Sequence, residues 1–157
     1  MLKIVTVTEE GEALDTIRQL FREYETGLNE NICFQSFEKE LQNPLQKYGS
    51  PKGYLAMAVW NEEVAGCIAF MPLGEGVCEM KRLYVRPAFR KHGIGRALSA
   101  HLIQKAREAG YGIMRLDTLP KLQAAVQLYR TLGFTDCEAY YHNPLEGVIY
   151  MEKKLTD

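Results

Sequence analysis

The most regular pattern in the chain is an apolar run followed by an amphipathic segment, between Cys78 and Gly110. Residues 78–85 are mostly apolar or long side chains, and the run stops at Arg86-Pro87 because proline cannot extend a sheet ladder. After a basic turn, hydrophobic residues recur at every fourth position, at Ile94, Leu98, Leu102 and Ala106. The pattern predicts a strand, a turn and a helix that ends at Gly110.

The segment before this unit predicts one strand and two helices. Residues 3–6 are β-prone and predict an edge or first strand, and residues 10–28 carry apolar side chains at helical spacing up to Gly27 and Asn29. A second, shorter helix is predicted to stop before Pro44. The aromatic residues of these helices, Phe21, Tyr24, Phe34 and Phe37, are predicted to pack in the core. The alternative is that the two helices form a lid over an acceptor pocket.

The remaining pattern completes a mixed sheet. Residues 54–59 and 63–71 predict a hairpin, and with residues 78–85 they predict a three-stranded antiparallel meander. Residues 112–117 predict a strand parallel to residues 78–85, because a helical crossover connects them. A helix at 121–132 and a hairpin of 135–141 with 148–154 follow. The predicted fold class is α/β, a mixed sheet with helices on both faces, in the order β-α-α-β-β-β-α-β-α-β-β.

Composition places the chain among globular proteins with one domain, predicted over residues 3–155. The chain has 157 residues, 46% hydrophobic and 25% charged, which is enough for one sizeable core. No run approaches the roughly 20 apolar residues of a membrane span, and the start has no signal-peptide core. We therefore expect a cytoplasmic protein without a membrane partner.

The net charge and the cysteine spacing limit which partners, disulfides and metal sites are expected. The net charge is −1, so nucleic acid is not expected as a partner and any basic cluster is interpreted as a local site. The cysteines are widely spaced, without a C-x-x-C pair, at Cys33, Cys67, Cys78 and Cys137. We predict free thiols, no disulfide framework and no metal site.

The basic turn before the helix is the main candidate for a binding site. It contains two glycines and four basic or polar side chains, in the order Arg90, Lys91, His92, Gly93, Ile94, Gly95 and Arg96. The first turn of a helix offers free backbone N–H groups, and glycine lets an anion approach them closely. A phosphate or pyrophosphate ligand is predicted; the alternative is a basic surface turn whose glycines serve backbone geometry only.

Two other glycine motifs do not fit this turn. A dinucleotide-binding loop needs a third glycine, where this chain has Leu98. A P-loop needs Gly-Lys followed by Ser or Thr, and the chain has no such triplet.

Two blocks together resemble the GNAT superfamily of N-acetyltransferases. The first is Arg90-x-x-Gly93-x-Gly95 after a strand that ends Leu-Tyr-Val-Arg-Pro, similar to the acetyl-coenzyme A signature of that family. The second is Ala-Val-Gln-Leu-Tyr at residues 125–129, followed by Gly133-Phe134. The resemblance implies acetyl-coenzyme A as cofactor, a GNAT-like acyl-CoA N-acyltransferase fold, and a splay between the strand at 78–85 and the next one, where the pantetheine arm inserts.

The resemblance also implies roles for single residues. Backbone N–H groups around Leu83, Tyr84 and Val85 would bind the pantetheine amide and polarise the thioester carbonyl. Tyr129 corresponds to a tyrosine near the coenzyme A sulfur and is the candidate proton donor; core packing is its alternative. Relatives frequently carry asparagine, which contacts the cofactor, where this chain has Leu122; the leucine side chain cannot make that polar contact.

Glu79 is the candidate general base, because family members often carry a glutamate there and an amine acceptor arrives protonated at pH 7. Alternation places Glu79, Lys81, Leu83 and Val85 on one face if no bulge intervenes. An ordinary Glu79–Lys81 ion pair is the alternative role.

Three functions remain open from the sequence. The first is an N-acetyltransferase that moves an acetyl group from acetyl-coenzyme A to a primary amine, in a small molecule, an amino-acid-like compound or a protein. The second is a non-catalytic coenzyme A-binding regulatory module, and the third an unrelated phosphate or nucleotide binder. The acceptor amine is not identified, and a homodimer is left open.

Overall fold

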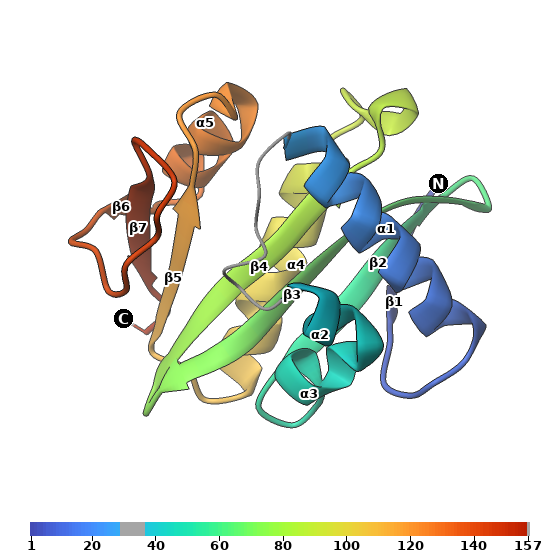
Figure 1. Ribbon diagram of the computed structural model, residues 1–157, viewed down its shortest axis with the longest axis horizontal. Coiled ribbons are helices and arrows are strands. Elements are labelled where there is room, and N and C mark those ends of the chain that lie inside the picture. The colour runs from blue at the N-terminus through green and yellow to red at the C-terminus, as the bar shows by residue number, and fades with distance from the viewer. Residues whose placement is uncertain (29–36, 157) are drawn as a thin grey trace.

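The computed structural model describes residues 1–28 and 37–156. In this part of the chain, the strands form one seven-stranded mixed sheet in the order β1-β2-β3-β4-β5-β7-β6, with helices on both faces (Figure 1). The predicted fold class is confirmed.

The first half of the sheet is an antiparallel meander. It consists of β1 (Leu2–Thr6), β2 (Tyr54–Trp60), β3 (Glu63–Gly74) and β4 (Val77–Val85). Asn61 and Glu62 form the β2–β3 turn with φ values of 48° and 71°, as a tight hairpin with left-handed residues requires. The predicted edge strand and the predicted meander are both present.

The two halves of the sheet meet through a short parallel contact. Helix α4 (Ile94–Glu108) connects β4 to β5 (Ile113–Thr118), and the parallel pairing is confirmed. Only three residue pairs join these strands, the last of them Glu79 with Arg115. Beyond this pair β4 and β5 part, which is the splay that the family resemblance implies.

The last strands differ from the prediction. Helix α5 (Gln123–Thr131) leads to β6 (Thr135–Asp136), which has two residues, and β7 (Ile149–Lys154) lies between β5 and β6. Residues 137–148 are irregular because side chains such as Tyr140 and Tyr141 bond to carboxylates of β4 and β5, away from the ladder with β7.

One face of the sheet carries α1 (Glu12–Leu28), α2 (Phe37–Gln42) and α3 (Pro44–Tyr48) (Figure 1). The shorter helix stops before Pro44 as predicted, but Pro44 then opens a third helix, since the first helical turn needs no N–H at that position. The short helix η2 (Pro87–Phe89) is also additional. Phe34 lies outside the described residues.

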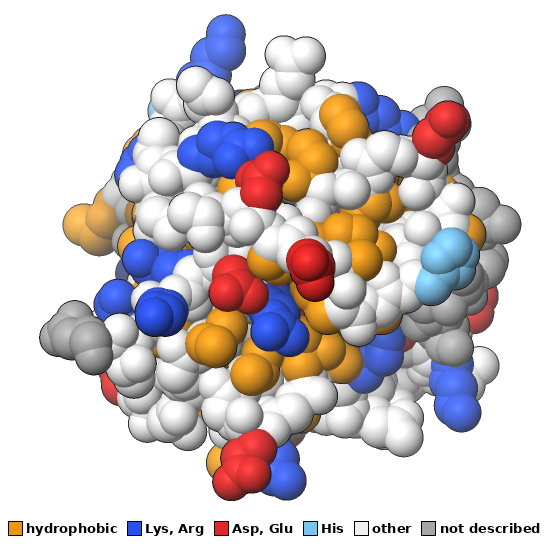
Figure 2. Space-filling view, turned by 90° about the vertical axis from the view of Figure 1, so that its left-hand side faces the viewer, with side chains coloured by type: hydrophobic (Ala, Val, Ile, Leu, Met, Phe, Trp, Pro, Cys, Tyr) orange, Lys and Arg blue, Asp and Glu red, His pale blue; other side chains and the backbone are white. Residues whose placement is uncertain are grey.

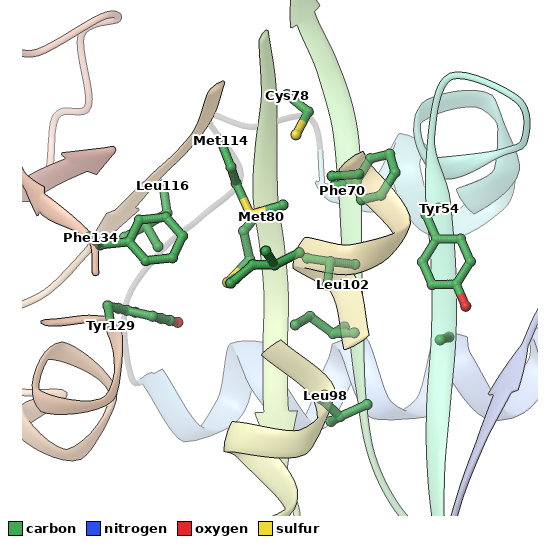
Figure 3. Packing of buried hydrophobic residues seen from close by; sticks show 14 of the residues in the cluster. Tyr54, Phe70, Cys78, Met80, Leu98, Leu102, Met114, Leu116, Tyr129 and Phe134 are labelled. Carbon is green, nitrogen blue, oxygen red and sulfur yellow. The ribbon is translucent and has the colours of Figure 1, made fainter. Parts of the chain in front are cut away.

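Each face of the sheet has its own hydrophobic core. On the α4 face, Met80 and Phe70 pack with Leu98 and Leu102 (Figure 3). On the other face, the fully buried residues include Leu14, Ile17, Phe21, Phe37 and Tyr48. Core packing is therefore confirmed for Phe21 and Phe37. Of the helices on this face, α1 contributes residues to the inner cavity described below, whereas α2 and α3 do not.

The surface beside β6 and β7 is mixed in charge. Figure 2 shows acidic and basic side chains next to each other on this face, with hydrophobic side chains between them. Among the residues that the structure describes, none forms a helix long and apolar enough to span a bilayer.

Candidate active site

A bulge in β4 determines which side chains face the site. Lys81 pairs with Ala69 and Tyr84 with Cys67, so β4 advances three residues where β3 advances two. Arg82, in the bulge, has a φ of 62°, which is rare for a residue with a side chain. The bulge reverses the alternation after Lys81.

The expectation that Glu79, Lys81, Leu83 and Val85 share one face assumed an unbulged strand, and this condition is not met. Cys78 and Met80 point into the α4 core, which leaves Glu79 and Lys81 on the α1 face. Leu83 and Val85 pack with the α4 core instead, whereas Tyr84 packs with the α1 core.

A groove of about 710 Å³ runs along the open end of β4. Eight of the predicted cofactor residues line it: Leu83, Tyr84, Val85, Arg90, Lys91, Gly93, Ile94 and Gly95. The opposite wall is the start of α5, including Leu122 at the position where relatives frequently have asparagine. The groove is large enough for an extended ligand of the size of a cofactor.

Two predicted cofactor residues point elsewhere. The His92 ring stacks on Trp60, with ring centroids 4.9 Å apart. Arg96 Nη2 donates a hydrogen bond to Thr131 Oγ1 at 2.8 Å. These side chains hold the turn against β2 and α5, and neither lines the groove.

The N-terminus of α4 opens into this groove. Gly93 caps the helix with a φ of 75°, and the first helical bond runs from Ala97 N to Gly93 O at 3.0 Å. The N–H groups of the first turn before Ala97 have no helical acceptor. Together with Arg90 and Lys91 beside them, they give an electrostatic environment suited to a phosphate group.

A smaller inner cavity, of about 70 Å³, lies between the parted strands. It is lined by Lys81, Arg82 and Leu83 of β4 and by Leu116, Asp117 and Thr118 of β5. The groove and the inner cavity share Tyr24, Leu28, Leu83, Leu122 and Ala125. The two spaces are therefore adjacent, and a ligand in the groove can extend one end to the inner cavity.

Tyr129 of α5 lines the inner cavity. Its side chain is 7% exposed and its ring packs edge-on against Phe134 at 5.9 Å, while the hydroxyl points toward β4 (Figure 3). The hydroxyl has no hydrogen bond to any residue in the described part of the chain. Burial raises the pKa of Tyr129, so the phenol is protonated and able to donate at neutral pH.

Glu79 lies at the closed end of the splay and does not line the inner cavity. It is 3% exposed, accepts a hydrogen bond from the Tyr140 hydroxyl at 2.5 Å, and has Lys81 Nζ at 3.8 Å. Burial raises the pKa of Glu79 more than Lys81 and Tyr140 lower it. The alternative, an ion pair with Lys81, is thus present. The raised pKa also brings proton uptake by the Glu79 carboxyl closer to neutral pH.

Asp117 was missed from the sequence. Its Oδ2 accepts hydrogen bonds from the Tyr141 hydroxyl and from Asn143 Nδ2, the latter at 2.8 Å. A usable signal existed: a charged residue at the carboxyl end of a strand parallel to β4 lies where α/β sheets bind ligands.

Arg82 and Glu40 form a second feature that sequence reasoning missed. Arg82 Nε and Nη2 donate to the Glu40 carboxylate at 2.9 and 3.0 Å, and the guanidinium lies 5.5 Å from the centre of the Phe37 ring. Lys47 Nζ also donates to Glu40 at 3.1 Å. This buried pair connects α2 to the bulge of β4.

The fold and this pair of connected spaces define an acyl-CoA N-acyltransferase architecture, and comparison with known proteins agrees. Residues 14–134 match the Acetyltransferase (GNAT) family. An uncharacterised N-acetyltransferase of Schizosaccharomyces pombe is 43% identical over 91% of this chain and 89% of its own.

Solved structures extend this likeness in the fold. A GNAT-family acetyltransferase of Staphylococcus aureus superposes with a TM-score of 0.81 at 18% identity, covering 99% of this chain and all of the other. The Campylobacter jejuni N-acetyltransferase PseH, solved with acetyl coenzyme A, gives a TM-score of 0.65 at 19% identity over 99% of this chain and all of its own.

The chain belongs to the GNAT family and is an acetyltransferase. Acetyl transfer from acetyl-coenzyme A is the general reaction of this family, and use of a coenzyme A-based cofactor is supported in general by its members.

Proposed function

We propose that this chain transfers the acetyl group of acetyl-coenzyme A directly to a primary amine. The groove takes the cofactor, with its pyrophosphate at the N-terminus of α4 beside Arg90 and Lys91 and its pantetheine arm along Leu83, Tyr84 and Val85. The acetyl end reaches the inner cavity. The observation that carries the proposal is that the groove continues into a cavity where the Tyr129 hydroxyl is directed.

The reaction follows from the groups around that cavity. The neutral amine nitrogen attacks the thioester carbonyl carbon, and backbone N–H groups near the β4 bulge stabilise the oxyanion that forms. The carbon–sulfur bond then breaks, and Tyr129 supplies a proton to the departing thiolate. Glu79, which does not line the cavity, accepts through water the proton that the attacking amine loses.

Thermal unfolding tests the cofactor assignment. Coenzyme A at 100 times its Kd should stabilise the wild type by about 2.7 kcal/mol, which corresponds to roughly 5–10 °C in Tm. Gly93→Glu places bulk and negative charge at the helix N-terminus, so it should abolish this rise. Gly110→Glu is the matched control, because Gly110 also has a positive φ, of 94°, and free space around it, but follows the other end of α4.

The control separates loss of the site from loss of stability. Both glutamates impose backbone strain and should lower the Tm of the free protein, but only Gly93→Glu should lose the coenzyme A response. An unresponsive wild type, or equal stabilisation by NAD or ATP, would contradict the proposed groove. Release of free thiol from acetyl-coenzyme A in the presence of amines then distinguishes an enzyme from a binding module.

A further inference from the structure

Asp117 lines the inner cavity, and only one of its two carboxylate oxygens is hydrogen-bonded to residues that the structure describes. Its Oδ2 is held by Tyr141 and Asn143, and Asn143 Oδ1 is fixed in turn by the backbone N–H of Leu145 at 2.9 Å. Oδ1 of Asp117 accepts no hydrogen bond from the residues that the structure describes. The carboxylate is therefore oriented by one oxygen and has the other oxygen available to a ligand.

The basic side chains at this cavity already have carboxylate partners. Arg82 is bound by Glu40 through two hydrogen bonds, and Lys81 lies 3.8 Å from Glu79. Both Arg82 and Lys81 are less than 10% exposed. A second carboxylate, brought by a ligand, would have to compete with these internal partners while lying near Asp117.

The rest of the cavity wall is largely aliphatic. The apolar lining residues that the cavity does not share with the groove are Met80, Leu116, Leu119 and Leu145. A wall of this kind favours a hydrocarbon group next to the reacting nitrogen.

We infer that the acceptor is an aliphatic or aralkyl primary amine without a carboxylate on the carbon that bears the nitrogen, and that Asp117 Oδ1 binds its ammonium group. This inference rests on the proposed acetyl transfer and specifies its substrate class. Asp117 contacts the substrate before the proton leaves, so its contribution is to binding and orientation. An α-amino acid would bring its carboxylate against Asp117, and like charges at such a distance repel.

Matched pairs of amines test the substrate class in the wild type. The pairs are phenethylamine with phenylalanine, 3-methylbutylamine with leucine, and tryptamine with tryptophan, and the members of each differ only in the α-carboxylate. Thiol release from acetyl-coenzyme A gives kcat/KM for each. We expect the amine to exceed its amino acid by at least about tenfold in each pair. A preference for the amino acids would overturn the inference and leave acetyl transfer intact.

The variant Asp117→Asn tests the residue. It should raise KM for phenethylamine by roughly 10- to 100-fold with little change in kcat, and bring the ratio within each pair close to one. Asp136→Asn is the control: it neutralises an exposed aspartate of β6 that pairs with Arg130 of α5. This variant should leave KM and kcat for phenethylamine unchanged. An unaltered pair ratio in Asp117→Asn would contradict its role as the ammonium site. If that variant does not fold, the wild-type ratios still decide the substrate class.

A binding measurement separates this inference from the proposed reaction. Phenethylammonium, added to the coenzyme A complex, should raise the Tm of the wild type and not that of Asp117→Asn. If no amine is acetylated but this shift is present, the ammonium site stands and acetyl transfer to these amines fails. If neither turnover nor a shift is found, the inference is wrong.

Discussion

Tyr129 combines a buried ring with a free hydroxyl, which is the combination that a proton donor to the departing sulfur requires. Tyr129→Phe keeps the contact with Phe134 and should lower kcat by roughly 10²- to 10⁴-fold, while the coenzyme A shift in Tm barely changes. Steady-state kinetics of thiol release provide the measurement.

A second tyrosine controls for the loss of a buried hydroxyl. Tyr111 is 8% exposed and donates its hydroxyl to Lys52 O at 2.6 Å, away from both spaces. Tyr111→Phe should lower stability slightly and leave turnover unchanged. Near-wild-type turnover in Tyr129→Phe would remove this residue as the acid.

The role of Glu79 as a base can be tested through the pH dependence of activity. Burial raises the pKa of its carboxyl, so the carboxylate that accepts a proton is lost at a higher pH than for an ordinary glutamate. Glu79→Gln should therefore reduce kcat/KM most between the raised pKa of Glu79 and the pKa of the amine; the two proteins should converge below the first, and the variant should be partly rescued as the amine loses its own proton near the second. The measurement is a pH profile of kcat/KM on an active amine. A loss independent of pH would assign Glu79 to its ion pair with Lys81.

Among single residues, the candidate binding residues were easiest to predict where backbone N–H groups, and not side chains, are expected to bind the ligand. Gly93, Gly95 and the turn around them could be recognised because a helix N-terminus follows from local spacing. Asp117 carried a signal in its place at the end of a strand, but its role depends on where β4 and β5 part; Arg82 carried none, because its role depends on a one-residue bulge. Both features arise from contacts between distant segments.

The pair of Glu40 and Arg82 shows how a helix of six residues, α2, supports the site. Arg82 adopts an unfavourable backbone conformation, costing about 1–3 kcal/mol, and the surrounding contacts must maintain it. Glu40 of α2 binds its guanidinium through two hydrogen bonds. The helix therefore constrains the bulge next to the inner cavity.

Removing Glu40 should be costly. Glu40→Gln leaves the buried Arg82 charge without its carboxylate and should lower the free energy of unfolding by about 3–5 kcal/mol. Glu38→Gln on the same helix is the control, since its pair with Arg22 is more than half exposed and should contribute less than about 1 kcal/mol. Urea unfolding measures both, and equal effects would contradict the importance of the buried pair.

The pH dependence of stability provides a second test of the same pair. Burial alone would raise the pKa of Glu40, but the charges and hydrogen bonds of Arg82 and Lys47 lower it below the ordinary value. A lowered folded-state pKa means that the stabilisation is fully present above the unfolded-state pKa, near 4.3, and is lost as pH falls through the folded-state value. The difference in stability between wild type and Glu40→Gln should shrink in that acidic range.

Whole elements were predictable where their pattern was long or their connection was constrained. Helices α1 and α4 follow from apolar spacing, and the parallel β4–β5 pairing follows from the crossover between them. The third helix was not foreseen because proline was interpreted only as a stop. The prediction extended the strand at Thr135 to Tyr141, because the tyrosines are β-prone. In the structure Tyr140 and Tyr141 bond to Glu79 and Asp117 and leave the sheet.

For the molecule as a whole, the pairing of β2, β3, β4 and β5 could be predicted, since short hairpins and a right-handed crossover allow few arrangements, whereas the position of β7 between β5 and β6 was not predicted. The face of each β4 side chain beyond Lys81 could not, because one inserted residue changes it. The resemblance to a family supplied the splay, which local periodicity does not encode.

The three residue pairs that join β4 to β5 also have a mechanical consequence. Strands β1 to β4 form one half of the sheet and β5 to β7 the other, and the three residue pairs of β4 and β5 join the two halves. The groove has one wall from each side, β4 and α4 on one and α5 on the other. A ligand that lies along the groove therefore contacts both halves of the sheet at once, and these contacts would add to the three β4–β5 pairs in holding the halves together.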